Sequence, residues 1–581
     1  MTQEELLKEN VRAGTGIARM LKDNGVQKVF GIPDGHTLAL YDGILQTKGI
    51  DHILLNDERT AAFAADAYAR VSGNLGVCDA GAAGSMNFPV ALAEAKGFGS
   101  PVLALVGVVQ VKHKLRNVPH DIDVAGVLKP ITKSTQEVFI PEQLPRFLKF
   151  AIRNAKNGKN GPTALIIPED VMQSQELALG EYIRTEGGSC AVEGCRIAPA
   201  ASEVEQAVRM IREAKQPVIF SGSQAVTSGA FREVKKLSEM LNAPVFSTIG
   251  GKGIISQTEE NLYFGTVGLF GEKPNHKFLR KSADLMIIVG NRMTEDDTAN
   301  FKIPSHKLKK IQIDIEPLEI GLTFDAQEIV GDCQIALSMM IEGLKEMGIS
   351  ESEDVEVVLK ERLDRIIKLK ADHLKYRERD NKNWLIKQPI KPQRVLKSIA
   401  DVMGPNDYLV TDASSSARWI GPYYPVKGLG RKIITARGVG PTGFGLGALI
   451  GTSIALDEVY SKEDKPHVVL ITGDGGLMNA GLSDLETIDK LGIDCTIIIL
   501  NNAALGFVKF GQGMLHQRRF YDTDRPKSNF IGIAKAFGAD AVQISQLSEL
   551  DQIIKEKITS PGFHVIDVLT DPKELLPPNY Y

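Results

Sequence analysis

Short apolar runs alternate with helical repeats along most of this chain, and the clearest example lies between residues 468 and 506. The apolar run at residues 468–472 predicts a buried strand, and the β-branched run at 496–500 predicts a second one. Between them, apolar residues recur at helical spacing, namely at Leu482, Leu485, Ile488 and Leu491. A strand–helix–strand unit of this kind pairs its strands in parallel, so that their carboxyl ends meet at one edge of a sheet. Open α/β sheets bind ligands at that edge.

The same alternation fills the segments that precede this unit. Near the amino terminus the strand patterns are KVFGIPDG, DHILLNDE, VCDAG and PVLALVGV, and the helical patterns cover residues 11–24, 60–71 and 89–96. In the middle of the chain the strand patterns are PVIFSG, APVFST, ADLMIIVG and KKIQID, with helical patterns at 203–214 and 229–241. Strands and helices that alternate in this way build parallel sheets with helices on both faces.

Two polar segments divide this pattern. Residues 171–195 are polar and Gly-rich, which is typical of a linker. Residues 346–392 are highly charged and predict an exposed helix and linker whose charges form a solvated face. We therefore predict an α/β protein of three doubly wound parallel-sheet domains at residues 1–190, 196–345 and 393–581.

Composition and charge narrow the class of protein. A chain of 581 residues is too long for a single core, and 43% apolar and 24% charged residues are ordinary for a globular protein. The net charge of −4 does not suggest a nucleic-acid partner, and no apolar run is long enough for a membrane span. The polar start MTQEELLKEN is unlike a secretory signal. The five cysteines are scattered, so we expect reduced thiols, Cys190 and Cys195 included, and a cytoplasmic location.

The loops after the two strands of the first unit carry the candidate chemistry. Gly473, Gly475 and Gly476 let backbone N–H groups approach a phosphate at a helix start. Asp474 and the amide oxygen of Asn502 are hard oxygen donors that suit Mg²⁺ when phosphate oxygens complete its shell. A plain Gly/Asp turn would explain GDG alone equally well, but the Asn-Asn pair after the next strand favours a metal and diphosphate site.

GDG, a helix-bearing spacer and then NN resemble the motif of thiamine diphosphate enzymes. The whole chain resembles the family that holds acetolactate synthase, pyruvate oxidase and related 2-oxo acid decarboxylases, and VFGIPDGHTLALYDGI and NDERTAAFAADAYAR resemble its pyrimidine-binding domain. The resemblance implies a central dinucleotide-like domain and a diphosphate-binding domain after it. It also implies that Asp474, Asn502 and the carbonyl of Ala504 hold Mg²⁺, with Leu505 and Gly506 beside the cofactor.

Two residues of the first domain have competing interpretations. From the residues alone, Glu58 opens a helix that Asn56 or Asp57 caps. The resemblance instead implies that Glu58 is the carboxyl group that activates the cofactor by hydrogen bonding to its aminopyrimidine ring. His120, in VPHDIDVAG, is either a surface loop residue or an active-site residue at a position where relatives carry a polar side chain.

The resemblance places further cofactor contacts in the third domain. Asp412, Ser415 and Ser416 are expected near the diphosphate, and the backbone of Gly438 and Gly440 is expected to face the cofactor ring. Thr442 stands where the family usually has a bulky apolar residue that supports the bent cofactor. Leu446 or Phe507 would then share that role.

The central domain binds flavin dinucleotide (FAD) in some members of the family and no ligand in others. IDIEPLEIG resembles the flavin-binding members, with Glu316 in place of the usual aspartate. Asp314 and Asp332 would then lie near the adenosine end of FAD. A fold without any ligand is the alternative.

The resemblance implies decarboxylation of a small 2-oxo acid such as pyruvate, in a homodimer or homotetramer that takes Glu58 from one subunit and the Mg²⁺ site from the other. We favour a carboligase of the acetolactate synthase type. NNAALGFV, with its aromatic Phe507, favours a flavin-dependent pyruvate oxidase instead. Gly511 replaces the acceptor-site tryptophan of acetolactate synthases, and their second arginine after Arg292 is missing. A catalytically silent nucleotide-binding regulator is a third alternative.

Overall fold

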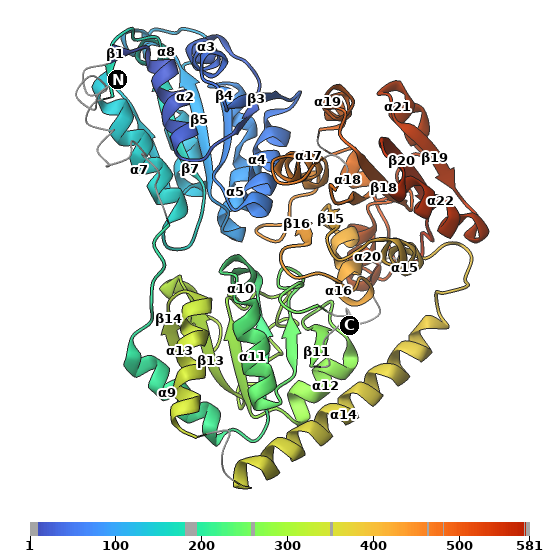
Figure 1. Ribbon diagram of the computed structural model, residues 1–581. Helices are drawn as coiled ribbons and strands as arrows, with labels where there is room; N and C mark the ends of the chain where they lie inside the picture. Colours follow the sequence, from blue (N-terminus) through green and yellow to red (C-terminus); the bar gives the residue numbers. More distant parts are fainter. Residues whose placement is uncertain are drawn as a thin grey trace.

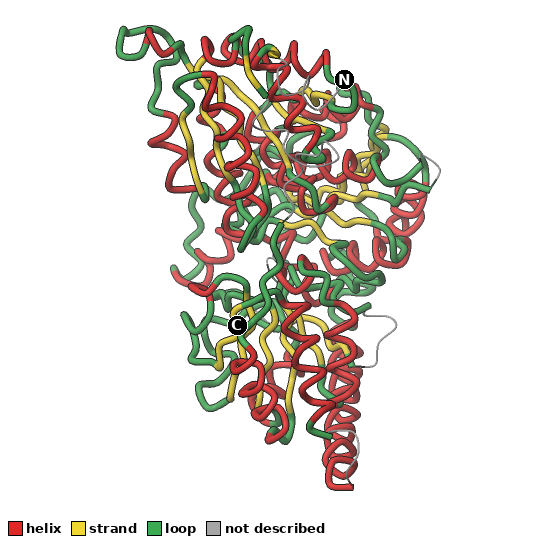
Figure 2. Tube along the Cα trace, turned by 60° about the vertical axis from the view of Figure 1, so that its left-hand side comes forward, coloured by secondary structure: helices red, strands yellow, loops and turns green. Residues whose placement is uncertain are grey.

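The computed structural model describes residues 10–179, 194–256, 262–348, 353–461, 464–479, 481–574 and 576. Three six-stranded sheets, all of them parallel, follow one another along the chain, and helices cover both faces of each (Figures 1 and 2). This confirms the predicted fold class. A small antiparallel pair joins β1 (Asn10–Val11) to β8 (Leu177–Ala178).

The first sheet has the strand order β3-β2-β4-β5-β7-β6, so the chain reverses direction across the sheet between β2 and β4. The side chains of the central strands are buried on both faces, which explains their uninterrupted apolar sequence. The strands are β2 (Lys28–Gly31), β3 (Asp51–Leu54), β4 (Gly76–Gly81), β5 (Val102–Val108), β6 (Ser134–Glu137) and β7 (Thr163–Pro168). The helices are α2 (Ala13–Asp23), α3 (Leu38–Gln46), α4 (Glu58–Ser72), α5 (Pro89–Phe98), α6 (Val124–Leu128), α7 (Leu144–Lys156) and α8 (Glu169–Met172).

The central sheet has the order β11-β10-β9-β12-β13-β14, with its reversal between β9 and β12. Its strands are β9 (Pro217–Ser221), β10 (Val245–Ser247), β11 (Tyr263–Thr266), β12 (Leu285–Val289), β13 (Lys309–Asp314) and β14 (Gln327–Val330). Its helices are α9 (Ala201–Glu213), α10 (Ser223–Thr227), α11 (Phe231–Leu241), α12 (Lys273–Lys281), α13 (Cys333–Glu346) and α14 (Glu353–Asn381).

The third sheet has the order β16-β15-β17-β18-β20-β19, with its reversal between β15 and β17. Its strands are β15 (Tyr408–Thr411), β16 (Ile433–Thr435), β17 (Val468–Gly473), β18 (Cys495–Asn501), β19 (Asp540–Ile544) and β20 (Phe563–Leu569). Its helices are α15 (Pro392–Val402), α16 (Ser415–Tyr423), α17 (Phe444–Asp457), α18 (Asp474–Leu477), α19 (Leu485–Leu491), α20 (Gly506–Leu515), α21 (Phe530–Ala536) and α22 (Leu547–Thr559).

Helices α4 and α17 join the first and third domains, and they lie side by side in Figure 1. Their small side chains let the two backbones approach closely: a Cβ on Gly451 would lie 2.0 Å from the carbonyl oxygen of Ala64. The rings of Phe63 and Phe444 meet edge to face at 5.4 Å, and both side chains are fully buried. The two domains therefore share one hydrophobic core.

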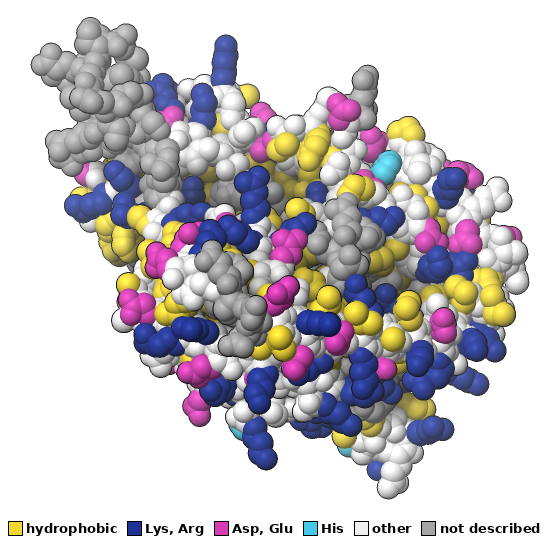
Figure 3. All heavy atoms as spheres, turned by 60° about the horizontal axis from the view of Figure 1, so that its bottom comes forward, with side chains coloured by type: hydrophobic (Ala, Val, Ile, Leu, Met, Phe, Trp, Pro, Cys, Tyr) yellow, Lys and Arg dark blue, Asp and Glu magenta, His cyan; other side chains and the backbone are white. Residues whose placement is uncertain are grey.

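We predicted that residues 346–392 form an exposed helix with a solvated face. One side of α14 is exposed as predicted, but the other side is buried. Ile366 and Leu369 are buried in a core cluster of the central domain, and the guanidinium of Arg362 donates to the carbonyls of Ala214 and Leu241. The exposed side carries charges of both signs, and Figure 3, which views this end of the molecule, shows Lys and Arg side chains among Asp and Glu. The apolar positions of the helix are too few among its charges to reveal the buried stripe.

Among the described residues, Cys78, Cys195, Cys333 and Cys495 are free thiols, and Cys190 lies outside the described residues. No helix in the described part of the chain combines the length and the apolar character that crossing a membrane requires.

Candidate functional site

One candidate site lies at the reversal point of the third sheet, where the carboxyl ends of β15 and β17 diverge. Parallel pairing of β17 with β18 sets Gly473 opposite Leu500, so that Asp474 and Asn502 leave the sheet side by side. Both residues line a cavity of about 460 Å³, a volume typical of small-molecule sites. The predicted cofactor residues that also line it are Ser415, Ser416, Thr442, Gly473, Gly475, Gly476, Ala504, Leu505 and Gly506.

The oxygen donors in this cavity suit a divalent cation. Asp474 is almost fully buried, and burial raises its pKa to about 6, although N–H donors and the positive charge of Arg525 act in the opposite direction. Asn502 accepts a hydrogen bond from the N–H of Ala504, which fixes the orientation of its amide oxygen. A buried carboxylate that is costly to ionise gains most from a cation. Asp474, Asn502 and Ala504 therefore fit the predicted Mg²⁺ site.

The rest of the cavity suits a diphosphate. The hydroxyl of Ser415 is buried at the cavity without a hydrogen-bond partner, which leaves a donor for a ligand oxygen. β17 ends at Gly473, and Gly475 and Gly476 follow it; a Cβ on Gly473 would meet nothing within 4 Å, so the backbone is accessible there. Arg525, which the sequence did not reveal, adds a positive charge whose Nε lies 3.8 Å from the Asp474 carboxylate.

Asp412 lies beneath this cavity rather than in its wall. Its carboxylate accepts hydrogen bonds from the N–H groups of Ala413 and Gly443 and from the hydroxyl of Thr472. Burial raises the pKa of Asp412 to about 6, while these donors act against the rise. Asp412 therefore connects the loop after β15 to the start of α17, and it would act on a cofactor through those loops.

Of the other residues predicted near the cofactor ring, some line the cavity and others do not. Gly438 and Gly440 do not line the cavity, whereas Thr442 does, and Asn479 donates to its carbonyl and hydroxyl oxygens. Leu446 is buried in the core shared by the first and third domains. Phe507 lines the cavity, with the Arg418 guanidinium 4.0 Å from the centre of its ring.

Glu58 follows β3, an edge strand of the first sheet, and it does not line the diphosphate cavity. It is the first residue of α4, and Asp57 caps that helix by accepting from the N–H of Arg59. The Glu58 carboxylate accepts from the side-chain amide of Asn87, and a Cβ on Gly84 would lie 2.4 Å from it. Glu58 is thus not among the residues that line the cavity of Asp474.

His120 lies exposed near two residues that the sequence did not single out. Its ring is 5.4 Å from the ring of His36, whose Nδ1 is 2.7 Å from the Asp34 carboxylate. A Cβ on Gly81 would lie 2.1 Å from that carboxyl group, so Asp34 packs on the end of β4 and Glu58 packs on the loop that follows it. Asp34 and His36 follow β2 at the carboxyl edge of the sheet, and that position is the signal that could have identified them.

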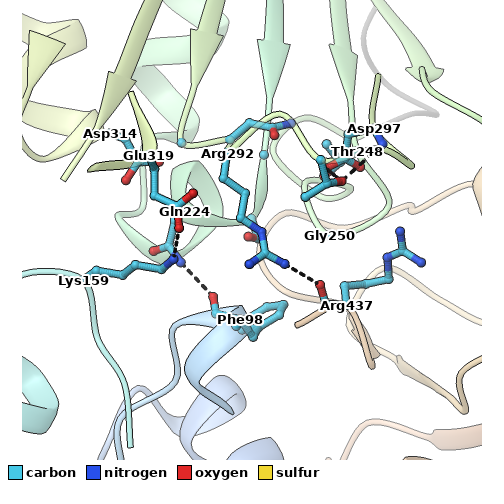
Figure 4. A pocket seen from close by; sticks show the side chains of 16 residues that line it. Phe98, Lys159, Gln224, Thr248, Gly250, Arg292, Asp297, Asp314, Glu319 and Arg437 are labelled. Atoms are coloured by element: carbon cyan, nitrogen blue, oxygen red, sulfur yellow. Dashed lines mark hydrogen bonds and ion pairs between the residues drawn. The ribbon is translucent and has the colours of Figure 1, made fainter. Parts of the chain in front are cut away.

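A second cavity lies at the reversal point of the central sheet, between all three domains (Figure 4). Asp314 lines it, and burial raises the pKa of that carboxyl group to about 6. Asp332 does not line it. That carboxylate caps α13 by accepting from the N–H groups of Gln334 and Ile335, and Arg196 pairs with it at 2.6 Å.

This central cavity has a volume of only about 50 Å³, whereas small-molecule sites usually offer about 300–1,000 Å³. Gln224 reaches across it to donate to the carbonyl of Phe98, and Arg292 reaches to the carbonyl of Arg437 (Figure 4). Lys159 pairs with Glu319 at 2.7 Å. The residues as they lie do not fit a flavin dinucleotide.

Comparisons with known proteins agree with this geometry. Three family models match in succession: the N-terminal TPP binding domain of thiamine pyrophosphate enzymes at residues 11–127, their central domain at 204–340 and their C-terminal TPP binding domain at 412–568. The chain belongs to the thiamine pyrophosphate enzyme family, and the predicted family and its dependence on this cofactor are confirmed.

Relatives that cover nearly the whole chain are named acetolactate synthases. The probable acetolactate synthase large subunit of Methanocaldococcus jannaschii is 31% identical over 98% of this chain and 93% of its own length. Acetolactate synthase of Arthrospira platensis is 31% identical over 97% and 95%, and the large subunit of isozyme 3 from Escherichia coli is 28% identical over 96% and 94%. The chain is thus an acetolactate synthase-like enzyme of this family.

Proposed function

We propose that the protein decarboxylates a small 2-oxo acid such as pyruvate and transfers the remaining acyl unit to a carbonyl acceptor, with thiamine diphosphate and Mg²⁺ as cofactors. The observation that carries this proposal is the cavity at the ends of β15, β17 and β18, where Asp474, Asn502 and Ala504 meet. Thiamine diphosphate, when bound, supplies a nucleophilic carbon for the keto group and accepts the electrons that carbon dioxide leaves behind.

The residues of the chain would hold the cofactor, exchange a proton with it and contact the substrate. Asp474, Asn502 and the Ala504 carbonyl would hold Mg²⁺ against the diphosphate oxygens. The free hydroxyl of Ser415 and the positive charge of Arg525 would orient those oxygens. Glu58 would hold a proton at its carboxyl group and exchange it with the aminopyrimidine ring. His120 would meet the substrate from the same sheet edge as Glu58.

A second copy of this chain would complete the site, in a homodimer or a homotetramer. Glu58 and the diphosphate cavity are separate within one chain, so an active site needs them from different copies. Large apolar side chains are also exposed on α20, whose first residues line the cavity, and in the segment after it: Val508 is 51% exposed, Leu515 72% and Tyr521 84%. Such exposed apolar groups are typical of a protein interface. We place this assembly in the cytoplasm, with no nucleic acid or membrane as partner.

The small central cavity supports a carboligase over a pyruvate oxidase. An oxidase must pass electrons to a bound flavin, and the cavity of about 50 Å³ has no room for one while Gln224 and Arg292 cross it. The flavin-binding role predicted for Asp314 and Asp332 is therefore not part of this proposal. The intact cavity with Asp474 supports an enzyme over a silent regulator.

The decisive experiment is product analysis. Protein freed of metal with a chelator is supplied with thiamine diphosphate, Mg²⁺ and pyruvate, and carbon dioxide and acyloin products are identified. We expect both products, and neither when Mg²⁺ or the cofactor is left out. Carbon dioxide with acetate or acetyl phosphate and bleaching of a flavin would instead establish an oxidase. No turnover of any 2-oxo acid in a panel would refute the proposal.

A further inference from the structure

Glu94, a fully buried acid on α5, binds four consecutive backbone N–H groups of the third domain. One carboxylate oxygen accepts from Arg437 at 2.8 Å and from Gly438 at 2.7 Å. The other accepts from Val439 at 2.8 Å and from Gly440 at 3.0 Å. A buried carboxylate is costly unless donors surround it, and here the four backbone donors all belong to one loop, residues 437–440.

The same loop is also held through its carbonyl groups. Arg292, from the central domain, donates to the carbonyls of Arg437 and Gly438 at 3.3 and 2.8 Å, and Figure 4 shows its side chain reaching toward Arg437. Asp296 pairs with the guanidinium of Arg437 at 2.5 Å. The first and central domains therefore fix opposite sides of loop 437–440.

Close packing explains one of the two glycines in this loop. A Cβ on Gly438 would lie 2.1 Å from the carbonyl oxygen of Glu94, and a Cβ on Gly97 would lie 2.7 Å from the carbonyl carbon of Gly438. Gly438 is thus needed for contact with α5. The outer side of the loop remains open, because Val439 and Gly440 are exposed.

Arg70, which belongs to the same domain as Glu94, balances the negative charge of Glu94. Arg70 donates to it at 3.1 Å, pairs with Asp66 as well, and lies 3.7 Å from the centre of the Phe98 ring. Although burial alone would raise the pKa of Glu94, Arg70 and the N–H groups of the loop lower it below its usual value. Glu94 is therefore ionised at neutral pH and accepts all of these hydrogen bonds.

Resting on the function proposed above, we infer that Glu94 is a positioning residue for thiamine diphosphate, because it fixes loop 437–440, which leads into the wall of the diphosphate cavity. The loop continues directly through Thr442, which lines the diphosphate cavity, to Gly443, which Asp412 holds. A loop already fixed from two sides loses little conformational freedom when a ligand binds. Arg292 supports the same shape from the carbonyl side.

The substitution Glu94→Gln tests this inference with little change of volume. A Gln amide nitrogen cannot accept a hydrogen bond, so two N–H groups of the loop lose their acceptor whichever way the amide turns. Thiamine diphosphate affinity, measured by calorimetry at saturating Mg²⁺, should fall about tenfold or more. The Michaelis constant for the cofactor should rise by the same factor, with a smaller change in kcat at saturating cofactor.

Glu272→Gln is the matched control. Glu272 is also a buried carboxylate, paired with Arg377 at 2.9 Å and His373 at 3.2 Å, but these partners and Glu272 itself lie in the central domain and α14, away from loop 437–440. Both variants should lose thermal stability, and only Glu94→Gln should lose cofactor affinity. Equal affinity losses in the two variants, or wild-type affinity in a folded Glu94→Gln, would overturn the inference.

Arg292→Ala keeps the inference testable if Glu94→Gln does not fold. It removes the carbonyl-side donors without leaving a buried charge, and a weaker cofactor affinity with unchanged Mg²⁺ affinity in the absence of cofactor is expected. Unchanged cofactor affinity in Arg292→Ala, with Glu94→Gln unfolded, would overturn the inference. Failure of the wild-type chain to bind thiamine diphosphate would refute the proposed function itself.

Discussion

Replacing Asp474 by asparagine should stabilise the ligand-free protein while it weakens cofactor binding. The carboxyl group is buried, and its pKa rises from 3.8 to about 6 because burial disfavours the charged form. A raised carboxyl pKa means that the folded state holds the proton more tightly than the unfolded state does. The ligand-free protein therefore loses stability as the pH rises from about 4 to about 6, and it carries the full cost at pH 7.

The size of this cost follows from the shift of about two pKa units. Each unit corresponds to about 1.4 kcal/mol, so the ionised Asp474 costs the ligand-free fold up to about 3 kcal/mol at pH 7. The side chain introduced by Asp474→Asn is neutral and nearly the same size, so the variant should unfold a few degrees higher than the wild type without ligands. Its unfolding temperature should also depend less on pH between 4 and 6.

The effect on the loaded protein should have the opposite sign. Removing one partner of a buried ionic pair typically costs about 3–5 kcal/mol, so affinity for thiamine diphosphate with Mg²⁺ should fall by about 10²- to 4 × 10³-fold. Scanning fluorimetry with and without cofactor, together with calorimetry, measures both effects on one preparation. A ligand-free variant that melts below the wild type would refute the stability cost derived from the raised pKa, and unchanged cofactor binding would refute the assignment of Asp474 as the metal ligand.

Three further outcomes are expected. Glu58→Gln keeps the volume of the side chain, but the Gln amide cannot share a proton, so turnover should fall about 10²-fold or more with a smaller loss of cofactor affinity. Near wild-type turnover would mean that Glu58 only opens helix α4. Gly451→Ala should destabilise the protein by about 1–3 kcal/mol, because the new Cβ would lie 2.0 Å from the Ala64 carbonyl oxygen. In the control variant Gly511→Ala, in α20, the new Cβ meets no neighbour, so this variant should be slightly more stable than the wild type. Equal effects of the two variants on the melting temperature would contradict this packing. Purified protein should show no flavin absorbance and should stay unbleached when mixed with pyruvate anaerobically, and rapid bleaching at the rate of carbon dioxide release would establish the oxidase instead.

The sequence by itself determined the local elements and the motif at the third sheet. Strands buried on both faces need continuous apolar runs, so β5, β17 and β18 were evident, and parallel pairing of β17 with β18 followed from the helix between them. The short edge strand β6 was not predicted, because an edge strand pairs through its backbone and its side chains, Ser-Thr-Gln-Glu, need not be apolar.

Only the tertiary structure decided which residues share a site. Asp474 and Asn502 could be paired from sequence because adjacent parallel strands bring them together, but Arg525, which was not predicted, reaches the same cavity from a distant segment. Glu94 reads as an ordinary helix residue in the sequence, and its role appears only when α5 packs against a loop 344 residues later in the chain. The pattern of residues within one segment specifies the periodicity of its backbone. Contacts between domains depend instead on how closely whole helices and strands pack, and no single segment of the sequence encodes this packing.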